Sequence, residues 1–170
     1  MNGHRWLACA IRPLLPLLLG AAALAACSDG ETGTSGTTTA TTTDTSGCAT
    51  DTRAQVYAVG LSESSADGAV KITFVDADPA PPAKGNNTWT VKLTDGSGAA
   101  LAGATIEATA YMPDHGHTSP IKPTGTEKDP GTYELTPVNL FMPGIWEVTL
   151  KVTPAGGMAE EVKFTFCVAG

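Results

Sequence analysis

Short runs of alternating apolar and polar residues fill the chain from residue 48 to residue 170, and Gly, Pro, Asn and Asp separate one run from the next. Alternation with a period of two is typical of a β-strand with one buried face, and this region sustains no helical period. The pattern predicts seven strands, at residues 55–60, 69–76, 87–94, 104–112, 132–136, 145–153 and 161–168.

Each predicted strand presents one apolar face, so two antiparallel sheets that stack these faces against each other would bury the apolar side chains. Seven short strands in about 120 residues are typical of an immunoglobulin-like sandwich. We therefore predict an all-β fold, an immunoglobulin-like antiparallel β-sandwich that occupies residues 48–170. Most of its core is expected to come from five aromatic side chains, Phe74, Trp89, Trp146, Phe164 and Phe166.

The first 27 residues have the features of an export signal. Basic residues near the start precede an apolar run that is too short, and too interrupted by proline, for a good membrane-spanning helix. The run ends in Leu24-Ala25-Ala26-Cys27, which resembles a bacterial lipobox. We predict that residues 1–27 are a lipoprotein signal peptide and that Cys27 is lipidated as the first mature residue. A simple secretory signal with Ala-x-Ala cleavage is the alternative, and it also exports the protein.

Residues 28–47 are rich in Thr, Ser and Gly and contain no large apolar side chain. Such a segment cannot offset its ordering entropy by burial, so we expect a flexible tether between the lipid and the folded domain. The predicted location is the bacterial cell envelope, with the protein anchored to the membrane through Cys27. Ser28, rather than Asp, follows this cysteine, which favours the outer membrane and a domain that faces the periplasm.

Two cysteines, Cys48 and Cys167, flank the predicted sandwich. Exported proteins fold in an oxidising compartment, so a disulfide between these residues is the default interpretation. It would close a loop of about 120 residues and stabilise the fold by roughly 4–5 kcal/mol on a chain-entropy estimate. Metal binding by two free thiols is the alternative.

Acidic residues dominate the charge of the mature chain. Beyond residue 27 the sequence has eight Lys and Arg against seventeen Asp and Glu, a net charge of −9. An acidic domain without a basic cluster is a poor binder of nucleic acid. The sequence shows no Ser-His-acid order, no Gly-rich phosphate loop and no paired carboxylates, so we predict that the protein is not an enzyme.

The segment from Met112 to Thr118 holds the candidate chemistry. It contains His115 and His117, the only histidines outside the predicted signal peptide, and His115 lies three residues after the thioether of Met112. A second Met-Pro pair begins at Met142. Imidazole and thioether ligands suit copper, above all Cu(I), better than any other common metal. Zinc is poorly supplied, with only two histidines and no free thiol.

The geometry of this candidate site depends on the connections between strands. If the segment is extended, His115 and His117 project to the same side, and Asp114 can hold an imidazole by a hydrogen bond or ligate Cu(II). One predicted strand separates the loop after residue 112 from the loop before residue 145, which would place these loops at opposite ends of the sandwich. A long connection at 137–141 would instead let the chain return along the sandwich and bring the two loops to the same end. The sequence leaves both arrangements open.

Four parts of the chain resemble the YtkA-like family, which is related to FixH-like extracytoplasmic proteins. They are residues 87–93, 98–107, 112–117, and 131–133 together with 141–148. The Met-Pro-Asp-His-Gly-His and Phe-Met-Pro-Gly-Ile-Trp elements carry most of the resemblance. It implies an immunoglobulin-type sandwich outside the cytoplasm and an association with copper handling and cytochrome oxidase biogenesis. The positions that match the metal-ligand pattern are Met112, His115, His117 and Met142.

Two hypotheses about function, from different classes, follow. The first is a membrane-tethered envelope lipoprotein that binds copper and holds it or passes it on, with a copper-donor or copper-acceptor protein as its partner. The second is a metal-free immunoglobulin-like module that displays the histidine loop to a protein partner.

Overall fold

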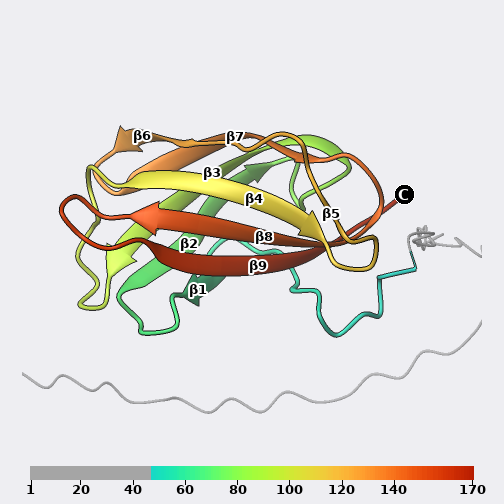
Figure 1. Cartoon of the computed structure of the whole chain (residues 1–170), viewed down its shortest axis with the longest axis horizontal. Coiled ribbons are helices and arrows are strands. Elements are labelled where there is room, and N and C mark those ends of the chain that lie inside the picture. Colours follow the sequence, from blue (N-terminus) through green and yellow to red (C-terminus); the bar gives the residue numbers. More distant parts are fainter. Residues whose placement is uncertain (1–46) are drawn as a thin grey trace, which may run out of the picture. The chain divides into compact units, whose positions relative to one another are not determined.

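The alternating apolar residues line the space between two antiparallel β-sheets that pack face to face (Figure 1). This computed structural model describes residues 47–170, and none of these residues belongs to a helix that could cross a membrane. The predicted signal peptide, Cys27 and the predicted tether up to residue 46 lie outside the described residues.

One sheet has five strands in the order β1-β2-β3-β7-β6, and the other has four in the order β5-β4-β8-β9. The five-stranded sheet consists of β1 (Ser62–Ser64), β2 (Val70–Asp78), β3 (Gly85–Asp95), β7 (Thr132–Leu140) and β6 (Gly125–Asp129). The four-stranded sheet consists of β5 (His117–Thr118), β4 (Thr105–Met112), β8 (Gly144–Thr153) and β9 (Glu160–Val168). The predicted all-β, immunoglobulin-like sandwich is confirmed, and five predicted strands match β2, β3, β4, β8 and β9 to within two residues at each end.

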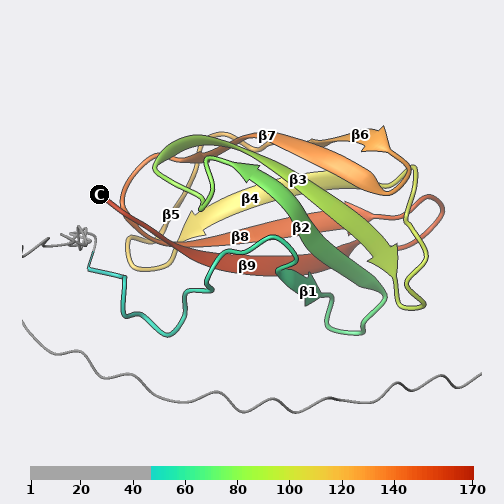
Figure 2. The ribbon, with the colours of Figure 1, turned by 180° about the vertical axis from the view of Figure 1, so that it is seen from behind.

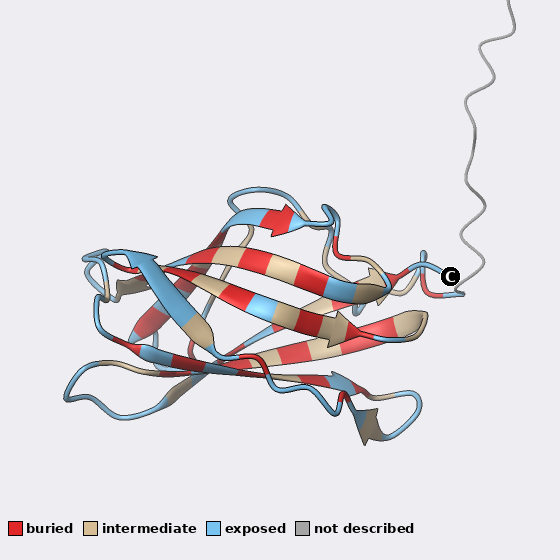
Figure 3. Cartoon of the chain, turned by 90° about the horizontal axis from the view of Figure 1, so that it is seen from above, coloured by how far each residue is buried: buried red, intermediate tan, exposed pale blue. Residues whose placement is uncertain are grey.

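Aromatic rings fill much of the space between the sheets. The ring of Phe74 lies 5.1 Å from that of Trp89 and 4.9 Å from that of Phe164, and Trp89 lies 5.6 Å from Phe166, all edge to face. All five predicted core aromatics are buried, and burial alternates along the long strands (Figure 3). Edge-to-face contacts of this kind stabilise the core beyond the effect of apolar burial alone.

Residues 55–60, predicted as the first strand, are not a strand. The N–H of Gln55 donates to the carbonyl of Thr165 in β9 (2.7 Å), whereas the N–H of Gly60 donates to the carbonyl of Phe74 in β2 (2.8 Å). The segment therefore begins beside one sheet and ends beside the other (Figure 2). A chain that crosses between sheets forms no continuous ladder with either, so this prediction was wrong.

A return passage of chain after the histidines was not predicted. After β5 the chain stays along β4, where Ser119 donates its N–H to Ala110 (2.8 Å) and Ala108 donates its N–H to Pro123 (2.9 Å), and then it joins the other sheet as β6. Four of the five residues of β6 are exposed, so no apolar alternation marks this strand in the sequence. Edge strands are commonly short and polar, because such edges resist pairing with other chains.

Strand β7 continues to Leu140, beyond the predicted end at residue 136. The chain passes Pro137 without leaving the sheet, because Thr136 and Pro137 together oppose a single residue of β3 in a β-bulge. The pairing of β7 with β6 ends at Leu135, so the missing N–H of Pro137 interrupts no ladder on that side. The residues predicted as a long connection, 137–141, are therefore mostly strand.

Tyr133 of β7 fastens the connection between β3 and β4 at the end of the sandwich where β4 begins. Its buried hydroxyl donates to the carbonyl of Leu101 (2.9 Å) and accepts from the N–H of Ala104 (2.8 Å). Because the two partners lie 29 and 32 positions earlier in the chain, the hydroxyl ties β7 to the connection between β3 and β4. Tyr133 is therefore a structural residue.

The substitution Tyr133→Phe leaves the N–H of Ala104 and the carbonyl of Leu101 without this partner. We expect the free energy of unfolding to fall by about 1–3 kcal/mol, the cost of unsatisfied buried polar groups. Urea denaturation measures the change, and a variant as stable as the wild type would show that these two hydrogen bonds do not stabilise the fold.

Glu127 of β6 makes a second fastening at the same end. One carboxylate oxygen accepts from the N–H of Gly131 (2.9 Å) and the other from the N–H of Gly103 (3.0 Å). These bonds favour the ionised carboxylate and lower the pKa of Glu127 below its ordinary value of 4.5, with the bond from Gly131 as the largest cause.

Because the pKa of Glu127 is lower in the folded than in the unfolded state, its ionised form stabilises the fold above about pH 4.5, and this stabilisation is lost as the pH falls through the folded-state pKa. The isosteric variant Glu127→Gln should therefore have a lower urea midpoint than the wild type at pH 7. The two midpoints should converge as the pH falls below 4.5. A difference that stays constant across this range would contradict the assignment.

Candidate metal centre

The two Met-Pro segments lie at the same end of the sandwich. Strands β4 and β8 are antiparallel neighbours, with Tyr111 opposite Glu147. Met112, the last residue of β4, is therefore close to the beginning of β8, which follows Met142. Figure 1 shows the end of β4 beside β8. The return passage through β5 and β6 explains why, since it adds one traverse of the sandwich and makes β7 run toward this end. The open question about the two loops is thus decided in favour of a shared end.

A tight turn carries His115 between β4 and β5. The carbonyl oxygen of Met112 accepts from the N–H groups of His115 (3.2 Å) and Gly116 (2.9 Å), and Gly116 adopts a φ of 69° that favours glycine. The backbone between the histidines is therefore turned rather than extended. The two imidazole rings still approach each other, with centroids 5.6 Å apart and planes at 83°. Two imidazoles this close can share one metal through metal–nitrogen bonds of about 2 Å.

His117 is half-buried against two aromatic rings. Its ring stacks on Phe141, with centroids 5.4 Å apart and an interplanar angle of 26°, and it lies 6.2 Å from the ring of Trp146. Its Nδ1 atom is buried and has no hydrogen-bond partner among residues 47–170. His115, by contrast, is exposed. The pair therefore combines one imidazole fixed by packing with one that is accessible from solvent.

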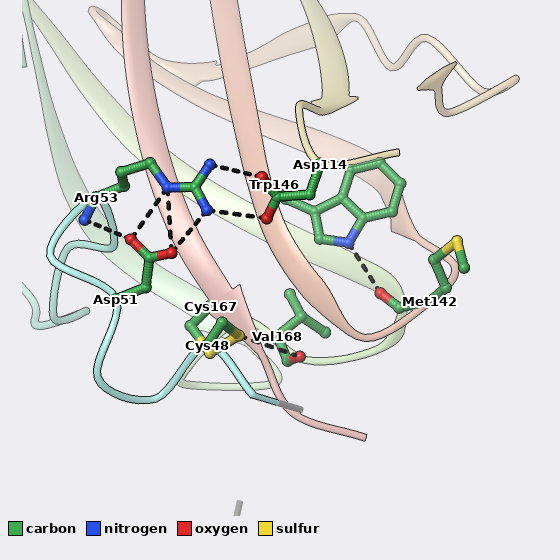
Figure 4. The surroundings of a disulfide bond; sticks show 8 residues. All are labelled: Cys48, Asp51, Arg53, Asp114, Met142, Trp146, Cys167 and Val168. Atoms are coloured by element: carbon green, nitrogen blue, oxygen red, sulfur yellow. Dashed lines mark hydrogen bonds and ion pairs between the residues drawn. A yellow bond between two sulfur atoms is a disulfide. The ribbon is translucent and has the colours of Figure 1, made fainter. Parts of the chain in front are cut away.

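The two methionines reach this end from the two different loops. Met112 is 1% exposed, and its methyl group packs so closely on Gly144 that a Cβ atom at that position would overlap it. Met142 is half-buried against the core, and its carbonyl oxygen accepts from the indole N–H of Trp146 at 2.9 Å (Figure 4). The side chain of Met112 thus contacts the loop that carries Met142.

Cys48 and Cys167 form the predicted disulfide, with their Cα atoms 5.6 Å apart. Cys167 lies opposite Ile145, the second residue of β8, so the disulfide is at the same end as the histidine turn (Figure 4). Both sulfur atoms are used in this bond, and the alternative of a metal site on two free thiols is therefore wrong.

Asp114 is paired with an arginine rather than with an imidazole. Its two carboxylate oxygens accept from Nη1 (2.8 Å) and Nη2 (2.9 Å) of Arg53, which also binds the carboxylate of Asp51 (Figure 4). Hydrogen bonds from Arg53 hold the pKa of Asp114 below its ordinary value, and bonds to Asp114 and Asp51 raise the pKa of Arg53 further. Asp114 was expected to accept a hydrogen bond from an imidazole N–H, and it accepts from Arg53 instead.

Sequence reasoning did not identify Arg53 as part of this region. It is the only arginine beyond the predicted signal peptide, which is the one feature of the sequence that singles it out. Its partner Asp114 is 61 positions away, and no periodicity links the two residues. Only the folded chain brings them together.

Within residues 47–170, no group of three or more His, Cys, Asp or Glu side chains is arranged to hold a metal ion. The donors gathered at this end of the sandwich are two imidazoles and two thioethers, a set that suits Cu(I). Met158, a further methionine, is 83% exposed in the connection between β8 and β9 at the opposite end of β8.

A protein-family model described as YtkA-like matches residues 64–151, slightly more than half of the chain. The matched span includes β2 to β7, most of β8, and all four candidate ligands. It leaves out Cys48, Arg53 and Cys167. No curated protein and no solved structure matches the chain significantly.

Proposed function

Because the chain belongs to the YtkA-like family, a family of envelope-associated domains, we propose that it is a membrane-tethered copper-binding protein of the cell envelope. In this proposal Met112, His115, His117 and Met142 hold Cu(I), and the protein is a carrier or store of the ion rather than an enzyme. Lipid on Cys27 anchors it, and residues 28–47 connect the anchor to the domain.

The state of His117 is the observation that carries the proposal. A buried polar atom without a partner is rare in folded proteins and calls for a specific explanation. The Nδ1 atom of His117 is one of three such side-chain atoms among residues 47–170, with Tyr57 Oη and Trp89 Nε1, and it alone belongs to a candidate ligand. The rings of His117 and His115 have centroids 5.6 Å apart. A metal ion held between the two imidazoles would satisfy this nitrogen.

The surroundings of His117 favour a soft, monovalent ion. Cu(I) prefers neutral imidazole and thioether ligands and accepts a low coordination number. Phe141 and Trp146 cover His117 and exclude water from that side of the ring. Both oxygens of Asp114, the residue before His115, accept hydrogen bonds from Arg53, which makes this carboxylate less available to the ion.

The point at which the predicted tether meets the domain fits a membrane-bound partner. The predicted tether joins the domain at Cys48, and the disulfide of Cys48 lies at the same end as the histidine turn. A copper donor or acceptor at the membrane is the partner that this connection favours. The proposed location, the periplasmic side of the outer membrane, rests on the sequence around Cys27.

One observation favours the alternative function, a metal-free interaction module. Met112 is 1% exposed and belongs to the hydrophobic core, so packing alone accounts for its presence. In that case Phe141 and Tyr111, which are 40% and 37% exposed, would offer apolar contact area to a protein partner at this end. The two functions differ in whether the histidines bind copper.

Anaerobic titration of the purified protein with Cu(I) against a competing chelator distinguishes them. We expect one high-affinity Cu(I) per chain, and we expect the double variant His115→Ala/His117→Ala to lose more than about 100-fold in affinity, since even changes beside metal ligands cost about 10–100-fold. The urea midpoint of the variant serves as the control for folding. Equal binding by wild type and variant would rule out copper binding at this site.

The contribution of the second loop is tested by two matched substitutions. We expect Met142→Leu to weaken Cu(I) binding about tenfold or more, because a thioether is lost at similar side-chain volume. Met158→Leu, made at an 83% exposed methionine far from the site, should leave the affinity unchanged. If both variants bind as tightly as the wild type, copper binding is confined to the histidine turn and Met142 is a packing residue.

A further inference from the structure

Arg53 is fixed on both sides by carboxylates. Its Nη1 and Nη2 atoms bind the two oxygens of Asp114 at 2.8 and 2.9 Å, and its Nε and Nη2 atoms bind Asp51 at 3.0 and 2.7 Å. Parallel bonds from a planar guanidinium to a carboxylate define orientation as well as distance. The position of Arg53 therefore dictates where the carboxylate of Asp114 lies.

Asp114 belongs to the turn that carries the metal ligands. It follows Pro113 and precedes His115, in a turn closed by two backbone hydrogen bonds to the carbonyl of Met112. The side chain of Asp114 is half-exposed, so no core packing fixes it. Its bond to Arg53 links this turn to a segment 61 residues earlier in the sequence.

The segment that carries Arg53 is itself fastened to β9 on both sides of the arginine. Before Arg53, Cys48 is joined to Cys167 by the disulfide. After Arg53, Gln55 donates its N–H to Thr165 (2.7 Å) and accepts the N–H of Thr165 on its side-chain oxygen (2.8 Å). Both attachments lie on the same strand, two residues apart, and they hold the arginine at the site end of the sandwich.

We propose that Arg53 is a positioning residue for the metal centre: held in place by the Cys48–Cys167 disulfide and by Gln55, it grips Asp114 and fixes the turn that presents His115 and His117. The copper-related part of this inference rests on the proposed function. Cys48, Arg53 and Cys167 all lie outside the span matched by the family model, so this support belongs to the chain's own flanking segments.

The test combines a double-mutant cycle with a matched control. The variants are Arg53→Gln, Asp114→Asn and the double variant, together with Lys128→Gln, which breaks another partly exposed ion pair, with Glu134 (2.8 Å), away from the site. Each is titrated with Cu(I), and its urea midpoint is measured. Backbone NMR relaxation reports the order of the amides of His115 and Gly116 without copper.

We expect Arg53→Gln and Asp114→Asn each to weaken Cu(I) binding about two- to fivefold, the range of an exposed ion pair, and the double variant to be no weaker than either single variant. Arg53→Lys, which keeps the charge but loses the fork of donors, should be intermediate. The turn amides should become more mobile in Arg53→Gln and stay ordered in Lys128→Gln.

A purely structural role would lower the urea midpoint while leaving the Cu(I) affinity and the turn amides unchanged, and this result would overturn the inference. If the wild type binds no Cu(I), the proposed function fails, and the turn amides of Arg53→Gln still decide whether Arg53 fixes the turn. Mobile amides would support its positioning role, and amides as ordered as in the wild type would refute it.

Discussion

Strands β4 and β8 lie side by side and antiparallel in the middle of the four-stranded sheet, so the end of β4 lies close to the beginning of β8. Met112 ends β4 with its side chain in the core, and Gly144 begins β8 without a side chain, which leaves room for the methyl group of Met112. Because the turn with His115 starts at Met112 and the loop with Met142 ends at Gly144, this contact sets the spacing of both loops.

A candidate ligand that is also a core residue would have consequences for binding. Packing fixes the position of Met112 before any ion arrives, and the stacking on Phe141 does the same for His117. Ligands held in this way lose little conformational entropy on binding, which is the advantage of a preorganised site. His115 is exposed and supplies the accessible side. The proposed centre thus combines two ligands fixed by packing, Met112 and His117, with one exposed ligand on the turn, His115.

The sequence was a good guide wherever one face of a strand is buried, and a poor one elsewhere. Alternation placed β2, β3, β4, β8 and β9 because burial imposes a period of two on their residues. It missed β6, whose residues are mostly exposed, and it misjudged Pro137, which the bulge in β7 accommodates. This missed strand determines where the candidate ligands lie. It adds one passage along the sandwich, so the loop after β4 and the loop before β8 are at the same end. The chemistry of the side chains identified His117 as a candidate ligand, but the sequence did not predict that its ring stacks on Phe141.

The candidate ligands and their supports come from different parts of the chain. Met112, His115, His117 and Met142 lie within the span shared with the YtkA-like family, whereas Cys48, Arg53 and Cys167 lie outside it. Arg53 binds Asp114, which lies in the turn between Met112 and His117 but is hydrogen-bonded to none of the four candidate ligands. In the positioning role proposed for Arg53, one carboxylate joins the two sets, so a change in the flanking segments would alter how firmly the turn is held without touching a candidate ligand. On the proposed function, the strength of Cu(I) binding would then be adjustable through Cys48, Arg53 and Cys167, which lie outside the matched span.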